Sequence, residues 1–319
     1  MFYRHVLTIL MAYLIDLIIG DPYSWPHPVK MIGSLIHFLD QKLNKDHKRD
    51  GIVMLGLVLI TVTLASISVL LLAYKIHTIL GLLVESILIA TTISQKGLKD
   101  AAMAVYQPLV NNQFLEARDQ LAHIVGRDTD SLNEAEITRA TVETVAENTT
   151  DGITAPIFWA FIAGGWGAII YRAINTCDSM VGYQNERYQH FGWASAKLDD
   201  LVNWIPARLT GTMMLYLTTK ESLADKKSIQ QLRMQAKKHP SPNSGWTEAA
   251  VALALGIELG GNNYYQSVLS KAARIGQAKR EIVSEDIKKT VKSMQLTSLF
   301  FVIILVLGAL IYGLTKTWI

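Results

Sequence analysis

Two long uncharged stretches of sequence constrain this chain more than any other feature. Residues 51–74 (GIVMLGLVLITVTLASISVLLLAY) contain no charge over 24 residues, and residues 295–315 (QLTSLFFVIILVLGALIYGLT) contain none over 21. About 20 residues of α-helix cross a hydrocarbon core of roughly 30 Å, because each residue advances the helix by about 1.5 Å. Both stretches are therefore predicted to be membrane-spanning helices.

Three further apolar stretches are weaker candidates for membrane segments. Residues 6–20 and residues 80–94 each contain one carboxylate, and the second follows the 51–74 stretch closely enough to form a helical hairpin with it. Residues 152–170 are long enough to span, but Pro156 and Gly164-Gly165 are expected to interrupt the helix. Such a segment suits a re-entrant or protein-buried position, where neighbours can satisfy the freed backbone groups.

The composition agrees with a membrane protein and excludes several other classes. Half of the residues are hydrophobic and only 18% are charged, with a mean hydropathy of +0.24, whereas soluble domains carry about a quarter charged residues. A chain this apolar is not disordered, and a net charge of +3 is no nucleic-acid footprint. The single Cys177 excludes an internal disulfide framework and a zinc site built from several thiolates.

The fold class follows from the scarcity of alternating β patterns. We predict an all-α, polytopic membrane protein, with one domain over residues 1–319 and a polar helical portion over residues 95–294. Lys and Arg concentrate in residues 21–50 and 218–294, so the positive-inside rule places these residues and the polar portion in the cytoplasm, beside the membrane lipid.

One predicted helix in the polar portion concentrates ionisable side chains. Glu136, Arg139, Glu143 and Glu147 recur at i, i+3, i+7 and i+11, which places them within about an 80° sector of a helix. Carboxylates stacked in this way repel one another unless they share a cation, and their oxygens suit Mg²⁺. The stripe, which Asp151 extends if the helix continues, indicates a magnesium or polar-substrate site, or else a solvated acidic face.

Turn and capping residues predict where the helices here begin and end. Asp130 or Ser131 is expected to be the N-cap of the acidic helix, with Glu134 completing a capping box. Pro108 is expected to break the helical stretch 95–120, because proline lacks the N–H that a helix interior needs.

A second group of polar residues follows the apolar stretch 152–170. Ionisable side chains at a membrane boundary are costly, so they form either an internal salt-bridge network or a functional site. Arginines offer forked donors for phosphate, and the Asp199-Asp200 pair resembles metal ligands, although neighbouring side chains on a helix point apart. The group comprises Tyr171, Arg172, Asn175, Asp178, Ser179, Tyr183, Asn185, Arg187, Asp199, Asp200, Asn203 and Arg208.

Two rigid proline turns also carry polar side chains. Residues 239–245 (HPSPNSG) lead into an Ala-rich helix that Glu248 begins, and a turn before a helix N-terminus is a natural anion site as well as an ordinary structural turn. A similar elbow holds Asp21-Pro22 and His27-Pro28. No P-loop, G-x-G-x-x-G, H-E-x-x-H or G-x-S-x-G motif occurs in the sequence.

Four long strings carry a family resemblance. GDPYSWPHPVKMIG (20–33), GRDTDSLNEAEITRATVETVAENTTDGITAPIFW (126–159), YRAINTCDSMVGYQNERYQHFGWASAKLDDLVNWIPARLTG (171–211) and HPSPNSGWTEAAVALALGIELGG (239–261) resemble, in order, the CbiB/CobD family of cobalamin biosynthesis. The resemblance covers nearly the whole chain. Its one departure is Cys177, where an apolar residue is expected.

The resemblance implies an integral membrane enzyme of the bacterial inner (plasma) membrane, adenosylcobinamide-phosphate synthase. Such an enzyme joins a propionate carboxylate of adenosylcobyric acid to (R)-1-aminopropan-2-ol or its O-phosphate, with ATP as a substrate and Mg²⁺ as the metal ion. Its small-molecule partners are then a corrinoid and an amino alcohol, with no nucleic acid. Neighbouring enzymes of the cobalamin pathway are further candidate partners.

The resemblance and the residue chemistry together assign roles, beginning with the catalytic residues Glu143, Glu147, Asp151 and Asp178. The expected magnesium ligands are Glu143, Glu147, Asp199 and Asp200. The expected substrate- and phosphate-binding residues are Arg127, Asp128, Arg139, Asn148, Arg172, Asn175, Ser179, Tyr183, Asn185, Arg187, Asn203, Arg208, His239, Ser241, Asn243 and Glu248. The N-terminal elbow contributes Asp21 and His27.

Two other classes of protein remain open. The chain could be a non-catalytic membrane sensor like the distantly similar AmpE proteins, although a sensor need not keep so many arginines and carboxylates together. It could instead be a corrinoid carrier or transporter, in which intramembrane charges mark a pathway, although we find no inverted repeat. An ATP-dependent amide product would distinguish an enzyme from both.

Overall fold

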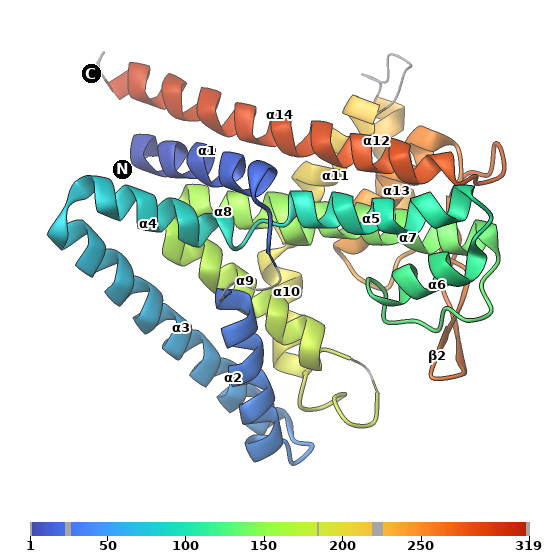
Figure 1. Cartoon of the computed structure of the whole chain (residues 1–319), viewed down its shortest axis with the longest axis horizontal. Helices are drawn as coiled ribbons and strands as arrows, with labels where there is room; N and C mark the ends of the chain where they lie inside the picture. Colours follow the sequence, from blue (N-terminus) through green and yellow to red (C-terminus); the bar gives the residue numbers. More distant parts are fainter. Residues whose placement is uncertain (1, 23–26, 184, 219–225, 317–319) are drawn as a thin grey trace. The chain divides into compact units, whose positions relative to one another are not determined.

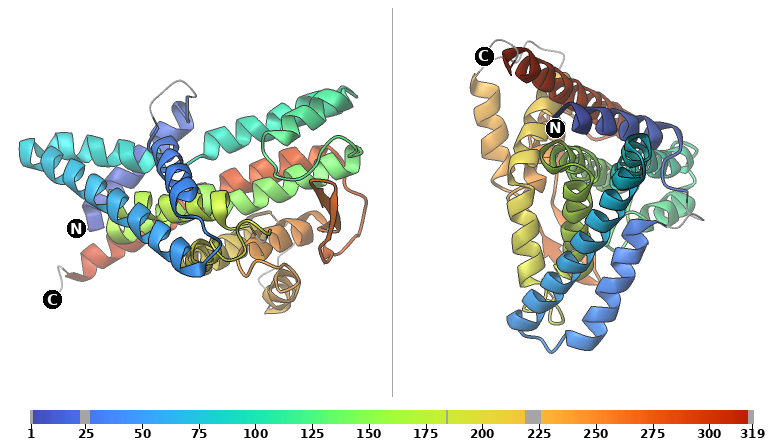
Figure 2. Two further views of the ribbon diagram at one scale, coloured as in Figure 1. Left: turned by 90° about the horizontal axis from the view of Figure 1, so that it is seen from below. Right: turned by 90° about the vertical axis from the view of Figure 1, so that its left-hand side faces the viewer.

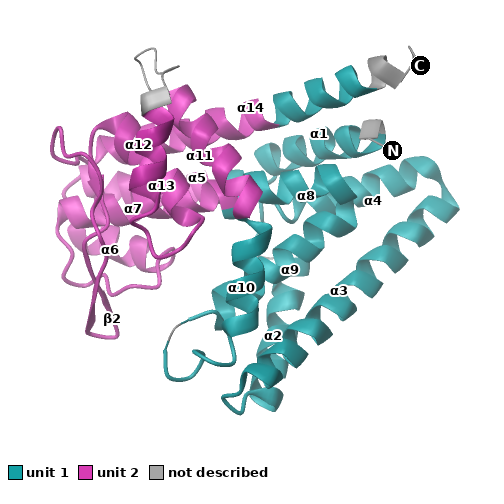
Figure 3. Cartoon of the chain, turned by 180° about the vertical axis from the view of Figure 1, so that it is seen from behind, with its two compact units in different colours: residues 1–96, 151–203, 302–319 teal, residues 97–150, 204–301 magenta. Residues whose placement is uncertain are grey.

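The computed structural model describes residues 2–22, 27–183, 185–218 and 226–316 (Figure 1). The chain divides into two compact units, each assembled from separate stretches of sequence (Figure 3). Unit 1 comprises residues 1–96, 151–203 and 302–319, and unit 2 comprises residues 97–150 and 204–301. Most of the polar portion predicted for residues 95–294 thus belongs to unit 2, while residues 151–203 belong to unit 1.

Unit 1 is helical. Its elements are α1 (Phe2–Ile18), α2 (Pro28–Leu43), α3 (Lys48–Ile76), α4 (Thr78–Ala90), α8 (Ala155–Ala163), α9 (Gly165–Val181) and α10 (Trp193–Val202), with the π-helical turn η1 (Thr150–Thr154) before α8. Helices α3 and α4 form the predicted hairpin (Figure 2). The reversal is tight because the extended backbone of His77 ends α3 and its Nδ1 accepts a hydrogen bond from Ile79 N of α4.

Helix α9 lies at the centre of unit 1 and packs against α2, α3, α8 and α10. Its Cys177 is buried in a hydrophobic cluster with Ile36 of α2 and Met54 of α3, so it acts as a small apolar residue, and burial raises the pKa of its thiol to about 12. Gly51 permits the close approach of α3, because a Cβ there would lie 1.8 Å from the carbonyl oxygen of Phe191.

The stretch 152–170 is interrupted as predicted. Helix α8 ends at Ala163, Gly164 has a positive φ of 74°, and α9 begins at Gly165. Pro156 does not interrupt the helix but lies in the first turn of α8, where a missing N–H leaves no hydrogen bond unmade.

Three helical stretches of the described residues are long and apolar enough to cross a membrane. They are Lys48–Ile76, Thr78–Val110 and Glu285–Tyr312, and the second includes the turn between α4 and the next helix. The predicted 51–74 and 80–94 stretches fall within the first two, and the predicted 295–315 stretch overlaps the third up to Tyr312, whereas α1 and α8 do not qualify. Together with the helical content, this confirms the predicted class, an all-α protein with membrane-spanning helices.

Unit 2 is helical with two short antiparallel ribbons. Its elements are α5 (Gln95–Val110), α6 (Phe114–Ala122), α7 (Glu134–Thr149), α11 (Trp204–Thr218), α12 (Lys226–Ala236), α13 (Ser244–Leu255), β1 (Glu258–Leu259), β2 (Asn262–Tyr265), β3 (Val268–Lys271), β4 (Ile275–Gly276) and α14 (Glu285–Lys316), which continues into unit 1 from Val302. Strand β1 pairs with β4, and β2 pairs with β3. Helix α13 packs against α7, α11 and α12.

The cap of α7 lies later than predicted. Asn133 is the N-cap, and its side chain and that of Glu136 form a capping box with each other's backbone N–H. The prediction of Asp130 or Ser131 with Glu134 was wrong because residues 129–132 form a turn that buries Leu132, whose carbonyl accepts from Arg118 Nε at 2.8 Å.

The break near Pro108 also lies later than predicted. Pro108 is inside α5, which continues to Val110, and the chain reverses at Asn112, whose φ is +59°. Gln113 N then donates to the Pro108 carbonyl oxygen at 2.9 Å, so the proline lies in the last turn of the helix rather than at its end.

Candidate active site

Glu143 is the fixed centre of the predicted acidic stripe on α7. Its Oε2 accepts from Arg127 Nη2 at 2.8 Å, and its Oε1 accepts from Arg139 Nη1 at 3.3 Å and from Gly260 N at 2.7 Å. The Glu143 side chain is buried, so two guanidinium groups and a backbone N–H replace the water that it lost on folding.

The loop between β1 and β2, together with the first residues of β2, completes this arrangement. Arg139 Nη1 donates to the Gly260 carbonyl oxygen at 2.6 Å, and Asn263 Oδ1 accepts from Arg127 Nη1 at 2.7 Å. Gly260 has a φ of +78°, and a Cβ there would lie 2.3 Å from the Ala273 carbonyl oxygen, so this position of the loop requires glycine.

Two further glutamates lie beside Glu143. Glu147, one turn along α7, accepts from Ser244 Oγ at 2.8 Å, and Ser244 begins α13. Glu248 is one turn along α13 and is only 5% exposed. His239 Nε2 lies 3.4 Å from Glu248 Oε1, and His239 Nδ1 accepts from Ser241 N at 3.0 Å. His239 Nδ1 also lies 3.3 Å from the Ser241 carbonyl oxygen, so the turn fixes the ring with Nε2 facing Glu248.

The electrostatics of this carboxylate cluster (Glu143, Glu147 and Glu248 with Arg127, Arg139 and His239) leave it short of positive charge. Burial raises the pKa of Glu248 well above its usual value, the charges of Glu143 and Glu147 raise it further, and the two arginines oppose the rise. Three carboxylates thus face two guanidinium groups, and the cluster favours a proton or a cation beside Glu248.

The donor set limits where Mg²⁺ fits. In the described residues no group of three or more His, Cys, Asp or Glu side chains is arranged to hold a metal ion. Magnesium needs fewer, because it is commonly held by one or two carboxylates together with substrate phosphates. Glu143 already accepts from three donors, so Glu147 and Glu248 are the cluster residues that fit Mg²⁺ or a substrate ammonium.

The 239–245 turn joins the cluster to Arg208. Ser241 Oγ accepts from Asn243 N and Ser244 N, both at 3.2 Å, which fixes the entry into α13. The buried Asn243 accepts from Arg208 Nη1 at 3.3 Å through its Oδ1. The predicted residues His239, Ser241, Asn243, Arg208 and Glu248 therefore lie together in unit 2.

A separate polar cluster lies in unit 1. Asn175 Nδ2 donates to Asp151 Oδ2 at 3.4 Å and to Asp199 Oδ1 at 3.3 Å, and Asn203 Nδ2 donates to Asp199 Oδ2 at 3.0 Å. Tyr171 OH donates to Asn203 Oδ1 at 2.8 Å, and burial raises the pKa of this phenol well above its usual value, which keeps it a donor.

Arg172 and Asp200 relate differently to this unit 1 cluster. Arg172 Nη1 lies 3.3 Å from both the Asp151 carbonyl oxygen and Asn175 Oδ1, so Arg172 belongs to the cluster. Asp200 lies 3.7 Å from Lys197 Nζ on the same helix, so the Asp199-Asp200 carboxylates point apart.

Comparison with known proteins identifies the family. A family model described as "CobD/Cbib protein" matches residues 9–294. The chain belongs to the CobD/CbiB family. Three relatives align over almost their whole lengths. "Cobalamin biosynthesis protein CobD" of Halalkalibacterium halodurans is 49% identical over 98% of this chain and 99% of its own. The Clostridium perfringens protein of the same name is 45% identical over 89% and 92%. "Cobalamin biosynthesis protein CbiB" of Salmonella typhimurium is 41% identical over 92% and 94%. No solved structure matches the chain.

Two predicted site residues of this CobD/CbiB chain in unit 2 hold local structure. Asp128 accepts from Gln266 N at 3.0 Å and from Ser267 N at 2.7 Å, at the tip of the β2–β3 hairpin, where both tip residues have positive φ. Asn148 donates to the Thr144 carbonyl oxygen of its own helix at 2.9 Å. Neither contact brings these side chains into the carboxylate cluster.

The remaining predicted residues lie in unit 1. Arg187 Nη2 pairs with the buried Asp40 at 2.8 Å, Asn185 Oδ1 accepts from Tyr188 N at 3.0 Å, and Ser179 Oγ donates to the Asn175 carbonyl oxygen at 2.9 Å. Tyr183 is exposed, with its ring 6.5 Å from that of Tyr188.

Asp178 and the N-terminal elbow also belong to unit 1. The Asp178 carbonyl oxygen accepts from Gly182 N at 2.7 Å, which ends α9. In the elbow, His27 Nε2 lies 3.1 Å from Asp21 Oδ1, and Ser94 Oγ donates to Asp21 Oδ2 at 3.0 Å.

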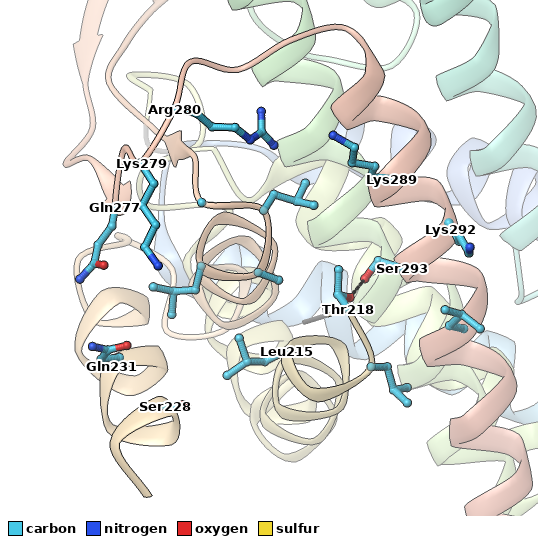
Figure 4. Close-up of a pocket in the computed structure, with 16 residues that line it drawn as sticks. Leu215, Thr218, Ser228, Gln231, Gln277, Lys279, Arg280, Lys289, Lys292 and Ser293 are labelled. Atoms are coloured by element: carbon cyan, nitrogen blue, oxygen red, sulfur yellow. Dashed lines mark hydrogen bonds between the residues drawn. The ribbon is translucent and has the colours of Figure 1, made fainter. Parts of the chain in front are cut away.

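Several residues around the carboxylate cluster of this family member have little or no sequence signal. Ser244 was visible only as part of the proline turn, and Asn263 had no sequence signal. The adjacent glycines Gly260 and Gly261 were the available signal, because both have positive φ and mark a close approach of backbone. A cavity of about 800 Å³ in unit 2 is lined by none of the predicted site residues (Figure 4). Of its cations, Arg280 and Lys289 both bind Asp286.

Proposed function

We propose that this chain catalyses ATP-dependent formation of an amide between a propionate carboxylate of adenosylcobyric acid and (R)-1-aminopropan-2-ol or its O-phosphate. Membership of the CobD/CbiB family supports a role in cobalamin biosynthesis, the pathway that its relatives' names state. The carboxylate cluster supports the chemistry. We place the enzyme in the bacterial plasma membrane, with its polar portion facing the cytoplasm.

The reaction requires activation of the carboxylate, because an ionised carboxylate does not acylate an amine. Transfer of the terminal phosphoryl group of ATP to a carboxylate oxygen forms an acyl phosphate and releases ADP. The amine nitrogen then forms a bond to the acyl carbon while the bond from that carbon to the phosphate oxygen breaks and phosphate leaves. The extra proton on nitrogen passes to a base of the protein.

Glu248 is the residue best suited to be that base. A base works best when its pKa lies near the operating pH, and burial beside two other glutamates raises the pKa of Glu248. The negative charges of Glu147 and Glu248 would also attract the substrate ammonium group and hold it near the acyl carbon. His239 Nε2, which lies 3.4 Å from Glu248 Oε1, would orient that carboxylate.

Glu147 would hold Mg²⁺ together with substrate phosphates, since Ser244 Oγ is the donor at one of its oxygens and its side chain is partly exposed. When bound, Mg²⁺ neutralises charge on the phosphate oxygens. Arg127 and Arg139 keep Glu143 ionised and in place, so their role in this proposal is to position the cluster.

The observation that carries this proposal is the buried Glu248 beside Glu143 and Glu147, where burial raises its pKa, in a member of this family. The test uses the full chain in lipid nanodiscs with adenosylcobyric acid, aminopropanol phosphate and MgATP, and mass spectrometry to detect the amide. We expect amide and ADP in equal amounts, and no amide without ATP. Corrinoid binding without any amide product would contradict the proposal and favour a carrier or a sensor.

A further inference from the structure

A cavity of about 660 Å³ opens beside the carboxylate cluster in unit 2. It is lined from three sides by α11, α12 and the 239–245 turn, and His239 is shared between the cavity and the cluster. The residues of its wall that matter here are Trp204, Arg208, Arg233, Lys237, His239 and Trp246.

The lining residues of this cavity that carry a full charge are all cations. Arg208, Arg233 and Lys237 line it, and no carboxylate of the described chain is among its lining residues. Burial lowers the pKa of Arg208, and the charge of Arg233 lowers it further, so the two guanidinium groups are close enough to repel each other. Arg208 donates to the Trp204 and Pro242 carbonyl oxygens and to Asn243 Oδ1, which fixes its charge in the wall. Cations grouped in this way match the charge of a polyvalent anion such as a phosphate chain.

Two tryptophans give the cavity a flat, apolar wall. The Arg208 guanidinium lies 4.2 Å from the centre of the Trp204 ring and 5.1 Å from that of Trp246, which keeps the arginine between the two rings. Trp204 is 51% exposed and lines the cavity, so part of its ring surface is accessible to a ligand. Nucleic-acid bases stack readily on such faces, and contribute about 1–3 kcal/mol for each stacked base.

The size of the cavity helps to select the ligand. Sites for drug-sized molecules and cofactors usually measure about 300–1,000 Å³, which includes 660 Å³. An amino alcohol phosphate has no ring to place on Trp204 or Trp246 and would leave most of this volume empty. A ligand with a planar base and several phosphates uses both the flat wall and the cations.

We propose that this cavity binds the nucleotide that supplies the phosphoryl group, in an enzyme that has no P-loop. The purine base lies against Trp204 and Trp246, the phosphates bind Arg208, Arg233 and Lys237, and the terminal phosphate points to His239 and the carboxylate cluster. The identity of the ligand as ATP rests on the proposed function. The same cations could instead hold the phosphate of an anionic lipid headgroup, and the experiment separates the two sources.

Binding is measured directly, by equilibrium dialysis of radiolabelled ATP with the full chain in phosphatidylcholine nanodiscs and without corrinoid. Arg233→Gln should raise the Kd for ATP and for inorganic tripolyphosphate at least tenfold. Trp204→Ala should raise the Kd for ATP about tenfold and the Kd for tripolyphosphate much less, because only ATP has a base to stack, while both ligands lose the ring that helps to hold Arg208. Both residues are exposed, so neither substitution empties the core. Lys238→Gln is the matched control, because Lys238 neighbours Lys237 without lining the cavity, and it should change neither Kd.

Several results would overturn the nucleotide assignment. One is equal ATP binding by wild type, Arg233→Gln and Trp204→Ala. Another is a wild-type protein that does not bind ATP in phosphatidylcholine nanodiscs but retains bound phosphatidylglycerol, when Arg233→Gln no longer retains that lipid. Amide formation with an unchanged KM for ATP in both variants would refute the cavity and leave the ligase standing. The expected ATP-binding pattern without any amide product would leave the cavity standing and refute the ligase.

Discussion

Glu143 and Glu147 lie one turn apart on α7, yet their removal should have opposite consequences. In Glu143→Gln the new amide keeps one oxygen for Gly260 N, but its NH₂ group faces an arginine donor where a carboxylate oxygen had accepted. Breaking a buried ion pair by removing one partner costs about 3–5 kcal/mol. For a chain of 319 residues the entropy of unfolding is about 0.7 kcal/mol per kelvin, so 1 kcal/mol corresponds to about 1.5 °C in Tm and we expect Tm to fall by about 4–8 °C.

Glu147→Gln should leave stability nearly unchanged. The Gln carbonyl oxygen can still accept from Ser244 Oγ, and loss of the charge removes a repulsion with Glu248. We expect a change in the free energy of unfolding of less than about 1 kcal/mol. Amide formation should nevertheless fall by about 10²-fold or more, as is common when a group acting in the reaction is removed.

The assay compares the two variants with wild type in the same nanodiscs. Tryptophan fluorescence on heating gives Tm, and mass spectrometry gives the initial rate of amide formation. The reasoning would be refuted by equal Tm values for Glu143→Gln and wild type, because Glu143 would then not hold the two arginines and the 260–263 loop in place. A large fall in Tm for Glu147→Gln would refute the division between a structural and a functional glutamate.

Three other perturbations test single features of the structure. Burial raises the pKa of Glu248 in the folded state, so folding favours its protonated form, and this contribution to stability is lost as the pH rises above the unfolded pKa near 4.5. The Tm of Glu248→Gln should therefore exceed that of wild type by more at pH 8 than at pH 5. A smaller difference in Tm at pH 8 would contradict the assignment. Asp128→Ala should speed amide hydrogen exchange at Tyr264–Leu269 about tenfold or more, because hydrogen bonds to a charged acceptor contribute about 1.5–3 kcal/mol. The control Asp130→Ala, at an exposed residue, should not change the exchange rate. Unchanged exchange in Asp128→Ala would show that Asp128 does not hold the hairpin. Gly51→Ala should lower the free energy of unfolding by about 1–3 kcal/mol, because the new Cβ meets the Phe191 carbonyl oxygen. The control Gly56→Ala, on the same helix, should be neutral or stabilising, because a Cβ there has no neighbour within 4 Å. Equal Tm values for the two variants would refute the close approach of α3 at Gly51.

The helices of this chain were largely predictable from local sequence. The uncharged runs 51–74 and 295–315 lie inside α3 and α14, and the stripe Glu136–Arg139–Glu143–Glu147 lies on α7. These features depend on the period of the helix and on the thickness of a bilayer, which act over short stretches of sequence. The error at Asp130 has a tertiary cause, because burial of Leu132 moves the start of α7 to a later residue.

The partners of the site residues were not predictable, because they come from distant sequence. Gly260 N reaches Glu143 across 117 residues, and Ser244 reaches Glu147 across 97. Local pattern also gave no sign that Glu248 joins Glu143 and Glu147, nor that Arg187, assigned to phosphate, pairs with Asp40. Residue types alone identify groups that could do chemistry, whereas burial and packing decide which of them meet.

The most direct test of the central claim is the initial rate of amide formation by Glu248→Gln in nanodiscs with saturating MgATP, adenosylcobyric acid and aminopropanol phosphate. If Glu248 takes the proton from the amine, the rate should fall by about 10²-fold or more, while Tm stays at or above that of wild type and the Kd for ATP is unchanged. A rate within twofold of wild type would show that the carboxylate cluster is not where the amide forms.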